Sequence, residues 1–181
     1  MYRSRINPQI VLKPQDLVVL LRLSLAHGEG HTYSSLASEL GLTASEVHAG
    51  MERAQAAQLV RKERSRKPQL QRDSLKQFVM YGAPYVFPAV RGEATRGLPT
   101  AYAAAPLRSM VIQPTNEPPP VWPYAKGPVR GAALYPLYPT VPMAAERNPA
   151  LYELLALFDA LRSGAARERK IASDLLAERL A

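Results

Sequence analysis

The chain has 181 residues, a net charge of +8 and an isoelectric point of about 9.9. A chain of this length can bury one good core, and its positive charge favours an acidic partner without separating nucleic acid from an anionic protein surface. The lack of cysteine excludes disulfides, thiolate catalysis and cysteine-bound zinc. The apolar runs are too short for a membrane helix, and the N-terminus lacks the apolar stretch of a secretion signal. We therefore expect a cytoplasmic protein with no membrane partner.

Residues 1–82 are predicted to form a first domain, because they hold only three of the 17 prolines and show helical periodicity. The first helix is expected to begin at Pro14, since proline is favoured at the first position of a helix. It continues through the leucine-rich stretch QDLVVLLRLSLAH and ends before Gly28 and Gly30.

Residues 32–60 predict a helix-turn-helix. Thr32 and Thr43 are N-cap signals for two short helices, and Gly41 supplies the turn between them. Glu46 follows Thr43 by three positions, as in a capping box. Six apolar residues fall on the facing sides of the two helices: Leu36, Ala37, Leu40, Val47, Met51 and Ala54. The alternative is a plain helical hairpin, or a winged helix used for protein contacts.

The basic run at residues 61–72 contains six Lys or Arg residues and a single acid. Leu59 and Val60 are expected to lead into a strand, with a turn around residues 64–66 and a return through residues 69–71. Three helices followed by a small β-hairpin form a winged helix, although a solvated loop is the usual fate of such a charge run. A further helix is expected over residues 74–81, with Gly82 ending it.

The side of the second helix opposite Val47, Met51 and Ala54 is expected to face duplex DNA. Small side chains would let the helix enter the major groove, and the basic hairpin would lie along phosphates or in the adjacent minor groove. This side has no central Arg, Asn or Gln, so it alone would give modest specificity. The candidate DNA-binding residues are Thr32, Thr43, Ala44, Ser45, His48, Ala49, Glu52, Arg53, Arg61, Lys62, Arg64, Arg66 and Lys67.

Residues 83–147 hold thirteen prolines but also many tyrosines, valines and leucines, together with Trp122. Because proline removes a backbone donor and disfavours helix before it, we predict an ordered but irregular segment that wraps a surface, with short strands or extended pieces. Residues 148–181 predict a helical hairpin, with Asn148 capping its first helix and a break at Ser163–Gly164. This hairpin is a possible dimerisation element. The fold class is therefore mainly α with a small β-hairpin.

Signatures of catalysis are missing from the sequence: it has no HExxH, no glycine-rich phosphate loop and no GxSxG. The HGEGH stretch at 27–31 is interpreted as a polar turn, and residues 91–100 as a buried structural loop, with a grip on an anion as the alternative. Glu153 and Asp159 are interpreted as solvated acids of a helix, ion-paired with Arg162. We expect no enzyme activity, no cofactor and no metal.

The motif LASELGLTASEV and the trailing QLVRKERSRKP resemble the winged helix-turn-helix of small bacterial transcriptional regulators of the MarR kind. The resemblance covers less than half of the chain. It implies a double-stranded DNA ligand, the helix at 43–57 in the major groove, and a homodimer that reads a near-palindromic site. We therefore expect a sequence-specific DNA-binding transcriptional regulator, a dimeric repressor. Small regulators of this build often serve as antitoxins, so the alternative is an antitoxin-type module that binds a partner protein, such as a toxin, through residues 83–181.

Overall fold

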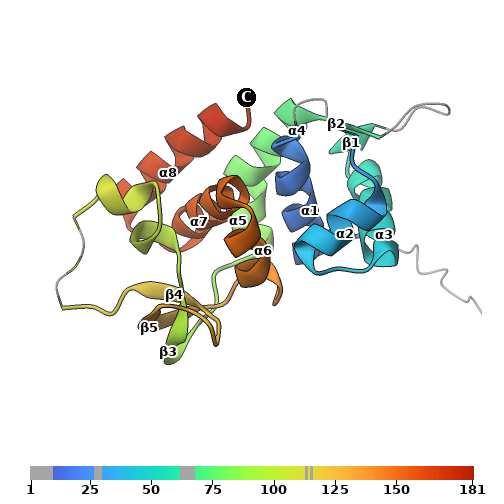
Figure 1. The fold of residues 1–181 in the computed structure, drawn as a ribbon. Coiled ribbons are helices and arrows are strands. Elements are labelled where there is room, and N and C mark those ends of the chain that lie inside the picture. The colour runs from blue at the N-terminus through green and yellow to red at the C-terminus, as the bar shows by residue number, and fades with distance from the viewer. Residues whose placement is uncertain (1–9, 27–29, 62–67, 113, 115) are drawn as a thin grey trace, which may run out of the picture.

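The computed structural model describes residues 10–26, 30–61, 68–112, 114 and 116–181. The chain is mostly helical, with a two-stranded hairpin and a three-stranded sheet (Figure 1). The α-helices are α1 (Pro14–Ser24), α2 (Tyr33–Leu40), α3 (Ala44–Ala56), α4 (Arg72–Gln77), α5 (Ala83–Val86), α6 (Val141–Arg147), α7 (Pro149–Ser163) and α8 (Ala166–Arg179). The strands are β1 (Val60–Arg61), β2 (Gln69–Leu70), β3 (Arg91–Pro99), β4 (Pro120–Pro123) and β5 (Val129–Leu134). Three short helical turns are η1 (Phe78–Gly82), η2 (Ala101–Ala103) and η3 (Leu107–Ser109).

The first three helices begin and pair as the sequence predicts. Pro14 is the first residue of α1, and the hydroxyl of Thr32 caps α2 by accepting from the Ser35 amide. Gly41 ends α2 with φ +66°, a left-handed conformation that glycine adopts without the strain of a Cβ. The six apolar residues predicted to lie between α2 and α3 are all buried.

The basic run is flanked by the predicted hairpin. Strands β1 and β2 pair antiparallel, with Val60 opposite Leu70 and Arg61 opposite Gln69. Val60 is buried while Arg61 is exposed, as alternation along a half-buried strand requires. The turn expected at residues 64–66 lies outside the described residues.

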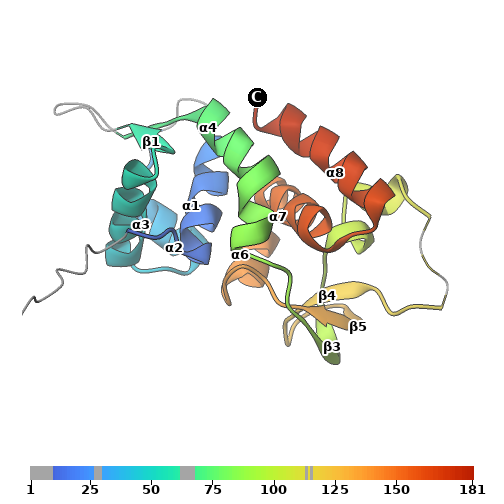
Figure 2. The same cartoon turned by 180° about the vertical axis from the view of Figure 1, so that it is seen from behind.

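The helix predicted for 74–81 starts earlier and ends later. Residues 72–86 form one continuous helical run, α4–η1–α5, in which η1 is a π-helical turn. Gly82 therefore does not end the helix, contrary to the prediction. Pro84 has no amide to donate to the carbonyl four residues back, and a widened π turn before it relieves this conflict. The domain boundary predicted at residues 82 and 83 thus falls inside a helical run, which passes between α1 and α7 (Figure 2).

The segment at 83–147 is ordered and contains short strands, as predicted, but these strands pair into a sheet, which was not predicted. Each of its three strands pairs with the other two: β3 runs antiparallel to both β4 and β5, while β4 and β5 are parallel. The stretch predicted as a buried loop, residues 91–100, is mostly β3, and its first half is exposed. Within the sheet, Pro99, Pro120 and Pro123 sit at strand ends, where proline is tolerated.

The tight closure of this sheet depends on glycine at position 97. A Cβ built on Gly97 would lie 2.1 Å from the carbonyl oxygen of Trp122, in the neighbouring strand β4. Backbone atoms cannot move aside as a flexible side chain can, so any larger residue would separate β3 from β4.

Helix α7 is the centre of the core. It contacts α1, α5, α6, α8 and η2, and it contributes to one hydrophobic cluster that extends from Leu17 to Leu180. The predicted hairpin of α7 and α8 is present, and Asn148 caps α7 by accepting from the Leu151 amide. Because the apolar side of α7 is filled by its own chain, α7 does not offer the dimer surface that we considered.

A buried ion pair within α7 is hydrogen-bonded to the sheet and to the residue that follows β3. The carboxylate of Asp159 is 2 % exposed and pairs with Arg162 at 2.7 Å, as predicted. It also accepts hydrogen bonds from the indole nitrogen of Trp122 (2.5 Å) and the hydroxyl of Thr100 (2.8 Å). Asp159 is therefore not a solvated acid, contrary to the prediction. Burial raises its pKa above the usual range, while Arg162 and the two hydrogen bonds oppose that rise.

Gly97→Ala is expected to destabilise the chain by about 1–3 kcal/mol, because the new methyl group overlaps the Trp122 carbonyl. Thermal unfolding followed by circular dichroism would measure the loss. Gly92→Ala on the same strand is the matched control, since its Cβ would meet the movable ring of Tyr135 and the Cβ of Ala133 at 3.3 Å, and no backbone atom is among these nearest neighbours. Equal melting temperatures for the Gly97→Ala variant and the parent chain would contradict the close approach.

Candidate nucleic-acid interface

The outward side of α3 has the exposure that a groove-binding helix needs. Thr43, Ala44, Ser45, His48 and Glu52 are exposed, and Ala49 is half-buried. The opposite side is sealed, since Val47, Met51 and Ala54 are at most 6 % exposed. Thr32, at the start of α2, is exposed as well. The structure therefore brings these predicted residues to the surface of one helix pair.

The N-terminus of α3 is held by a capping box and by a tyrosine from a distant part of the chain. Thr43 accepts from the Glu46 amide, and Glu46 accepts in return from the Thr43 amide at 2.7 Å. The hydroxyl of Tyr138 donates to the second oxygen of Glu46 at 3.1 Å. The hydrogen bonds from Thr43, and then that from Tyr138, lower the pKa of Glu46, and the same contact raises the pKa of Tyr138. The first turn of α3 is thereby fixed in place.

Arg53 faces the protein and not the solvent, which corrects its prediction as a residue at the edge of the DNA-facing side. Its guanidinium makes a two-pronged ion pair with Asp16, with nitrogen–oxygen distances of 2.6 and 2.7 Å. Asp16 is 1 % exposed and Arg53 only 17 %. The hydrogen bond from Asp16 raises the pKa of Arg53. A buried carboxylate needs a fixed cation, so Arg53 is held by α1.

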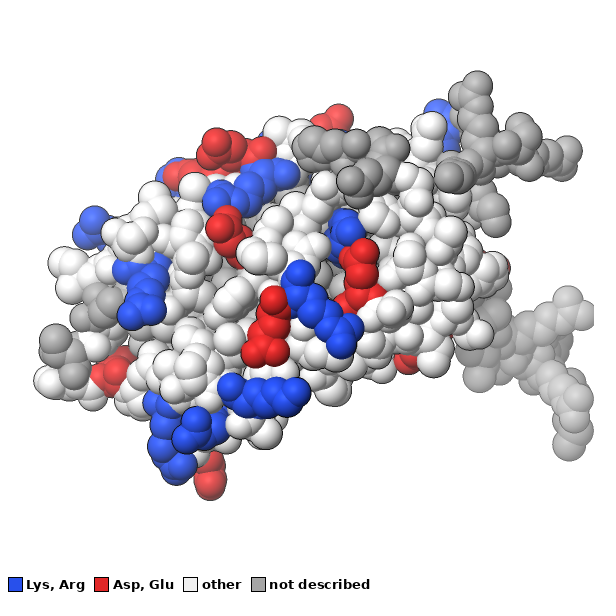
Figure 3. All heavy atoms as spheres, in the orientation of Figure 1, with Lys and Arg blue, Asp and Glu red and all other residues white. Residues whose placement is uncertain are grey.

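Charge is sparse around the helix pair. In Figure 3 the surface where Figure 1 draws α2 and α3 is nearly free of charged side chains. On the outward side of α3, His48 lies beside Glu52 at 4.0 Å and edge-on to the ring of Tyr33. Arg61 is exposed on β1, while Lys62, Arg64, Arg66 and Lys67 lie outside the described residues. Contacts to phosphate would therefore have to come from the hairpin that follows α3.

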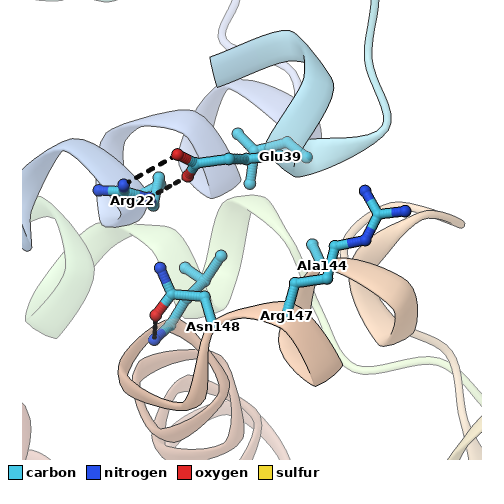
Figure 4. Close-up of a pocket in the computed structure, with 7 residues that line it drawn as sticks. Arg22, Glu39, Ala144, Arg147 and Asn148 are labelled. Carbon is cyan, nitrogen blue, oxygen red and sulfur yellow. Dashed lines mark hydrogen bonds and ion pairs between the residues drawn. The ribbon is translucent and has the colours of Figure 1, made fainter. Parts of the chain in front are cut away.

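A hollow of about 230 Å³ lies between α1, α2, α6 and α7 (Figure 4). Its charged and polar residues already have partners within the protein. Arg22 pairs with Glu39 at 2.5 Å, Arg147 donates to the Ser38 carbonyl, and Asn148 caps α7. These contacts join the helix pair to α6 and α7, so the side chains that line the hollow serve the packing of the helices.

A second hollow of about 490 Å³ separates the sheet from the turn between α7 and α8. Arg91, Tyr102, Glu117 and Glu168 are among the residues that line it. Within the described part of the chain, no group of three or more His, Asp or Glu side chains is placed to hold a metal ion. In the same residues, no helix combines the length and the apolar character needed to cross a bilayer.

Comparison with known proteins gives no match to a family model, to a curated protein or to a solved structure.

The two side chains that fix α3 from outside were not found from the sequence. Asp16 has the signal of a first-turn acid, which indicates a helix start and says nothing about Arg53, 37 positions later. Tyr138 is in a proline-rich segment with no periodic signal. Both contacts are long-range, so only the assembled fold reveals them.

Arg53→Met is expected to cost about 3–5 kcal/mol of stability, because it leaves the Asp16 carboxylate buried without its cation, with only the Lys13 amide still donating to it. Denaturant unfolding would measure this cost, and Asp16→Leu added to Arg53→Met should recover part of it. Arg22→Met is the matched control: its partner Glu39 has a side chain 40 % exposed, so losing that pair should cost only about 0–1 kcal/mol. Similar losses of stability for Arg53→Met and Arg22→Met would show that the buried Asp16–Arg53 pair matters no more to stability than the partly exposed Arg22–Glu39 pair.

Proposed function

We propose that this chain is a transcriptional regulator that binds double-stranded DNA through the exposed side of α3, with β1 and β2 beside it as a wing. One observation carries the proposal: α3 follows α2 through a left-handed glycine turn, buries one side, and leaves Ala44, Ser45 and His48 uncovered. A helix presented in this way fits the major groove of B-DNA.

The residue types on α3 support groove entry more than tight specificity. Ala44 and Ala49 are small enough to let the helix approach thymine methyl groups, and Ser45 can donate to a phosphate or a base edge. Glu52 can accept from a cytosine amine. No arginine is available on the described part of this side, since Arg53 is bound to Asp16. The proposed base readout is therefore modest.

A homodimer that represses transcription is part of the proposal. Two-fold symmetric regulators of this kind read half-sites about 34 Å apart, so each protomer must present one recognition helix to successive major grooves.

Ala44→Asp is the sharpest test of this proposal. Ala44 is exposed at the first position of α3, where a negative charge favours the helix by about 0.3–1 kcal/mol. The same charge repels phosphate, so duplex binding should weaken by about 1–3 kcal/mol while the fold is kept. The measurement is selection of a preferred duplex from a random pool, followed by fluorescence anisotropy with both proteins.

Ala150→Asp provides the control, because Ala150 is also an exposed alanine in the first turn of a helix, α7. This variant should bind the selected duplex as the parent does. If Ala44→Asp and the parent bind that duplex equally well, α3 does not read DNA.

The second candidate function is that of an antitoxin-type module, and an exposed group of large side chains favours it. Tyr81 and Tyr85, four residues apart in the run α4–η1–α5, are 76 % and 84 % exposed. Val86 and Val90 follow at 51 % and 55 %. Exposed aromatic residues are typical anchors of protein interfaces.

Tyr81→Ser with Tyr85→Ser tests the second function. The exposed rings contribute little to folding, so the melting temperature should stay close to that of the parent. If residues 83–181 bind a protein encoded beside this chain, the variant should bind that protein more weakly by about 2 kcal/mol or more. Less of that protein should then co-purify with the variant than with the parent. Unchanged co-purification of a neighbouring product would remove these tyrosines from the interface.

A further inference from the structure

The sheet formed by β3, β4 and β5 carries a group of basic side chains at one end of the molecule. Arg96 on β3 and Arg130 on β5 are directly opposite each other in the antiparallel ladder, and both are exposed. Lys126, in the turn between β4 and β5, is exposed as well. In Figure 3, Lys and Arg side chains gather over the lower part of the molecule, where Figure 1 draws these strands. We call Arg96, Arg130 and Lys126 the sheet cluster.

The sheet cluster lacks the carboxylates that other arginines of this chain have. Arg96 donates to the Gly127 carbonyl at 3.2 Å, and Arg130 to the Ala94 carbonyl at 3.4 Å. Within the described residues, no acid forms an ion pair with either of them, and Glu93 on the same strand makes none. Like charges directly opposite in a ladder destabilise a sheet. A bound anion would remove that repulsion.

The surroundings of the sheet cluster favour a nucleic acid over a protein as the source of that anion. Ala94 and Ala132, the next pair along the ladder on the same side, are small and leave the strand backbones accessible. The described strands β3, β4 and β5 themselves expose no large apolar side chain. Val90 and Tyr135 are exposed, but they adjoin the end of the β3–β5 ladder that is far from the two arginines of the sheet cluster. A protein partner needs such anchors, whereas a phosphate backbone requires only positive charge and access.

We propose that the sheet cluster binds the phosphodiester backbone of a nucleic acid, as a contact separate from α3. In both ribbon views α3 and the sheet lie at opposite ends of the molecule (Figures 1 and 2). The sheet cluster therefore does not depend on α3 reading DNA. It supplies sequence-independent affinity, because phosphate contacts carry no base information.

The test uses the full chain and the double variant Arg96→Gln with Arg130→Gln. Each glutamine can still donate to a carbonyl but carries no charge. The probes are a labelled duplex of random sequence and a labelled single strand of the same length, titrated at several salt concentrations. Affinity should fall by about tenfold for the probe that binds, and the slope of log affinity against log salt should fall by about two.

Arg167→Gln with Arg169→Gln is the matched control, because it removes two exposed charges from α8. Its affinity and salt slope should stay near those of the parent. Lys126→Gln gives a second variant outside the strands, for which the slope should fall by about one. The arm that responds, duplex or single strand, identifies the form of nucleic acid that is bound.

Three outcomes would overturn the proposal: an unchanged salt slope in both sheet-cluster variants, equal losses in the α8 control, or weaker binding to polyglutamate but not to either oligonucleotide. The last outcome would identify an acidic protein as the partner. Failure of α3 is distinguishable from these, because Ala44→Asp affects the selected duplex and leaves the salt slope for random sequence in place.

Discussion

The buried carboxylate of Asp159 is the constraint on which the sheet half of the structure depends. A charge in the core must be compensated by donors in fixed positions, and these come from three separate parts of the chain: Arg162 on α7, Trp122 on β4 and Thr100 after β3. Arg162 also donates to the carbonyls of Phe87 and Tyr135, which flank β3 and β5. Displacing any one of these elements would leave a buried charge or carbonyl without its partner. The position of the sheet on α7 is therefore specified by polar contacts as well as by apolar packing.

The helix pair depends on a second pair of the same kind. Asp16 of α1 and Arg53 of α3 are joined by two short hydrogen bonds in a largely buried setting, which fixes how α3 lies across α1. Helix α7 connects the two halves, because it contacts α1 on one side and η2, next to the sheet, on the other. One continuous core thus carries α3 at one end and the sheet cluster at the other, so the two surfaces keep a fixed separation.

Local signals were enough to predict α1, α2, α3, α7 and α8 from the sequence, whereas α6 was not predicted. Capping residues at Thr32, Thr43 and Asn148, a proline at the start of α1 and the glycine turn at Gly41 act within a few residues, so they can be seen without the fold. Periodicity placed Val47 and Met51 inward and Ser45 and His48 outward, which the structure bears out. Short strands were expected in this region, but their pairing into a sheet was not. The pairing joins residues far apart in the chain, such as Thr95 and Gly131, 36 positions apart, and leaves no periodic trace in short strands. The helix end predicted at Gly82 was wrong, because the helical run continues through a π turn to Val86.

Charged residues mark the limit of prediction from sequence in this chain. Arg53 has no local feature that separates it from Arg96 and Arg130, yet Arg53 is held by a buried carboxylate and the other two face solvent opposite each other. A helical or strand pattern assigns a side to each residue, but only the assembled fold supplies the counter-ion. An arginine with a carboxylate is retained for the stability of the fold. An arginine directly opposite another arginine lowers the stability of the sheet, because the two charges repel each other. A ligand that brings negative charge would remove this repulsion.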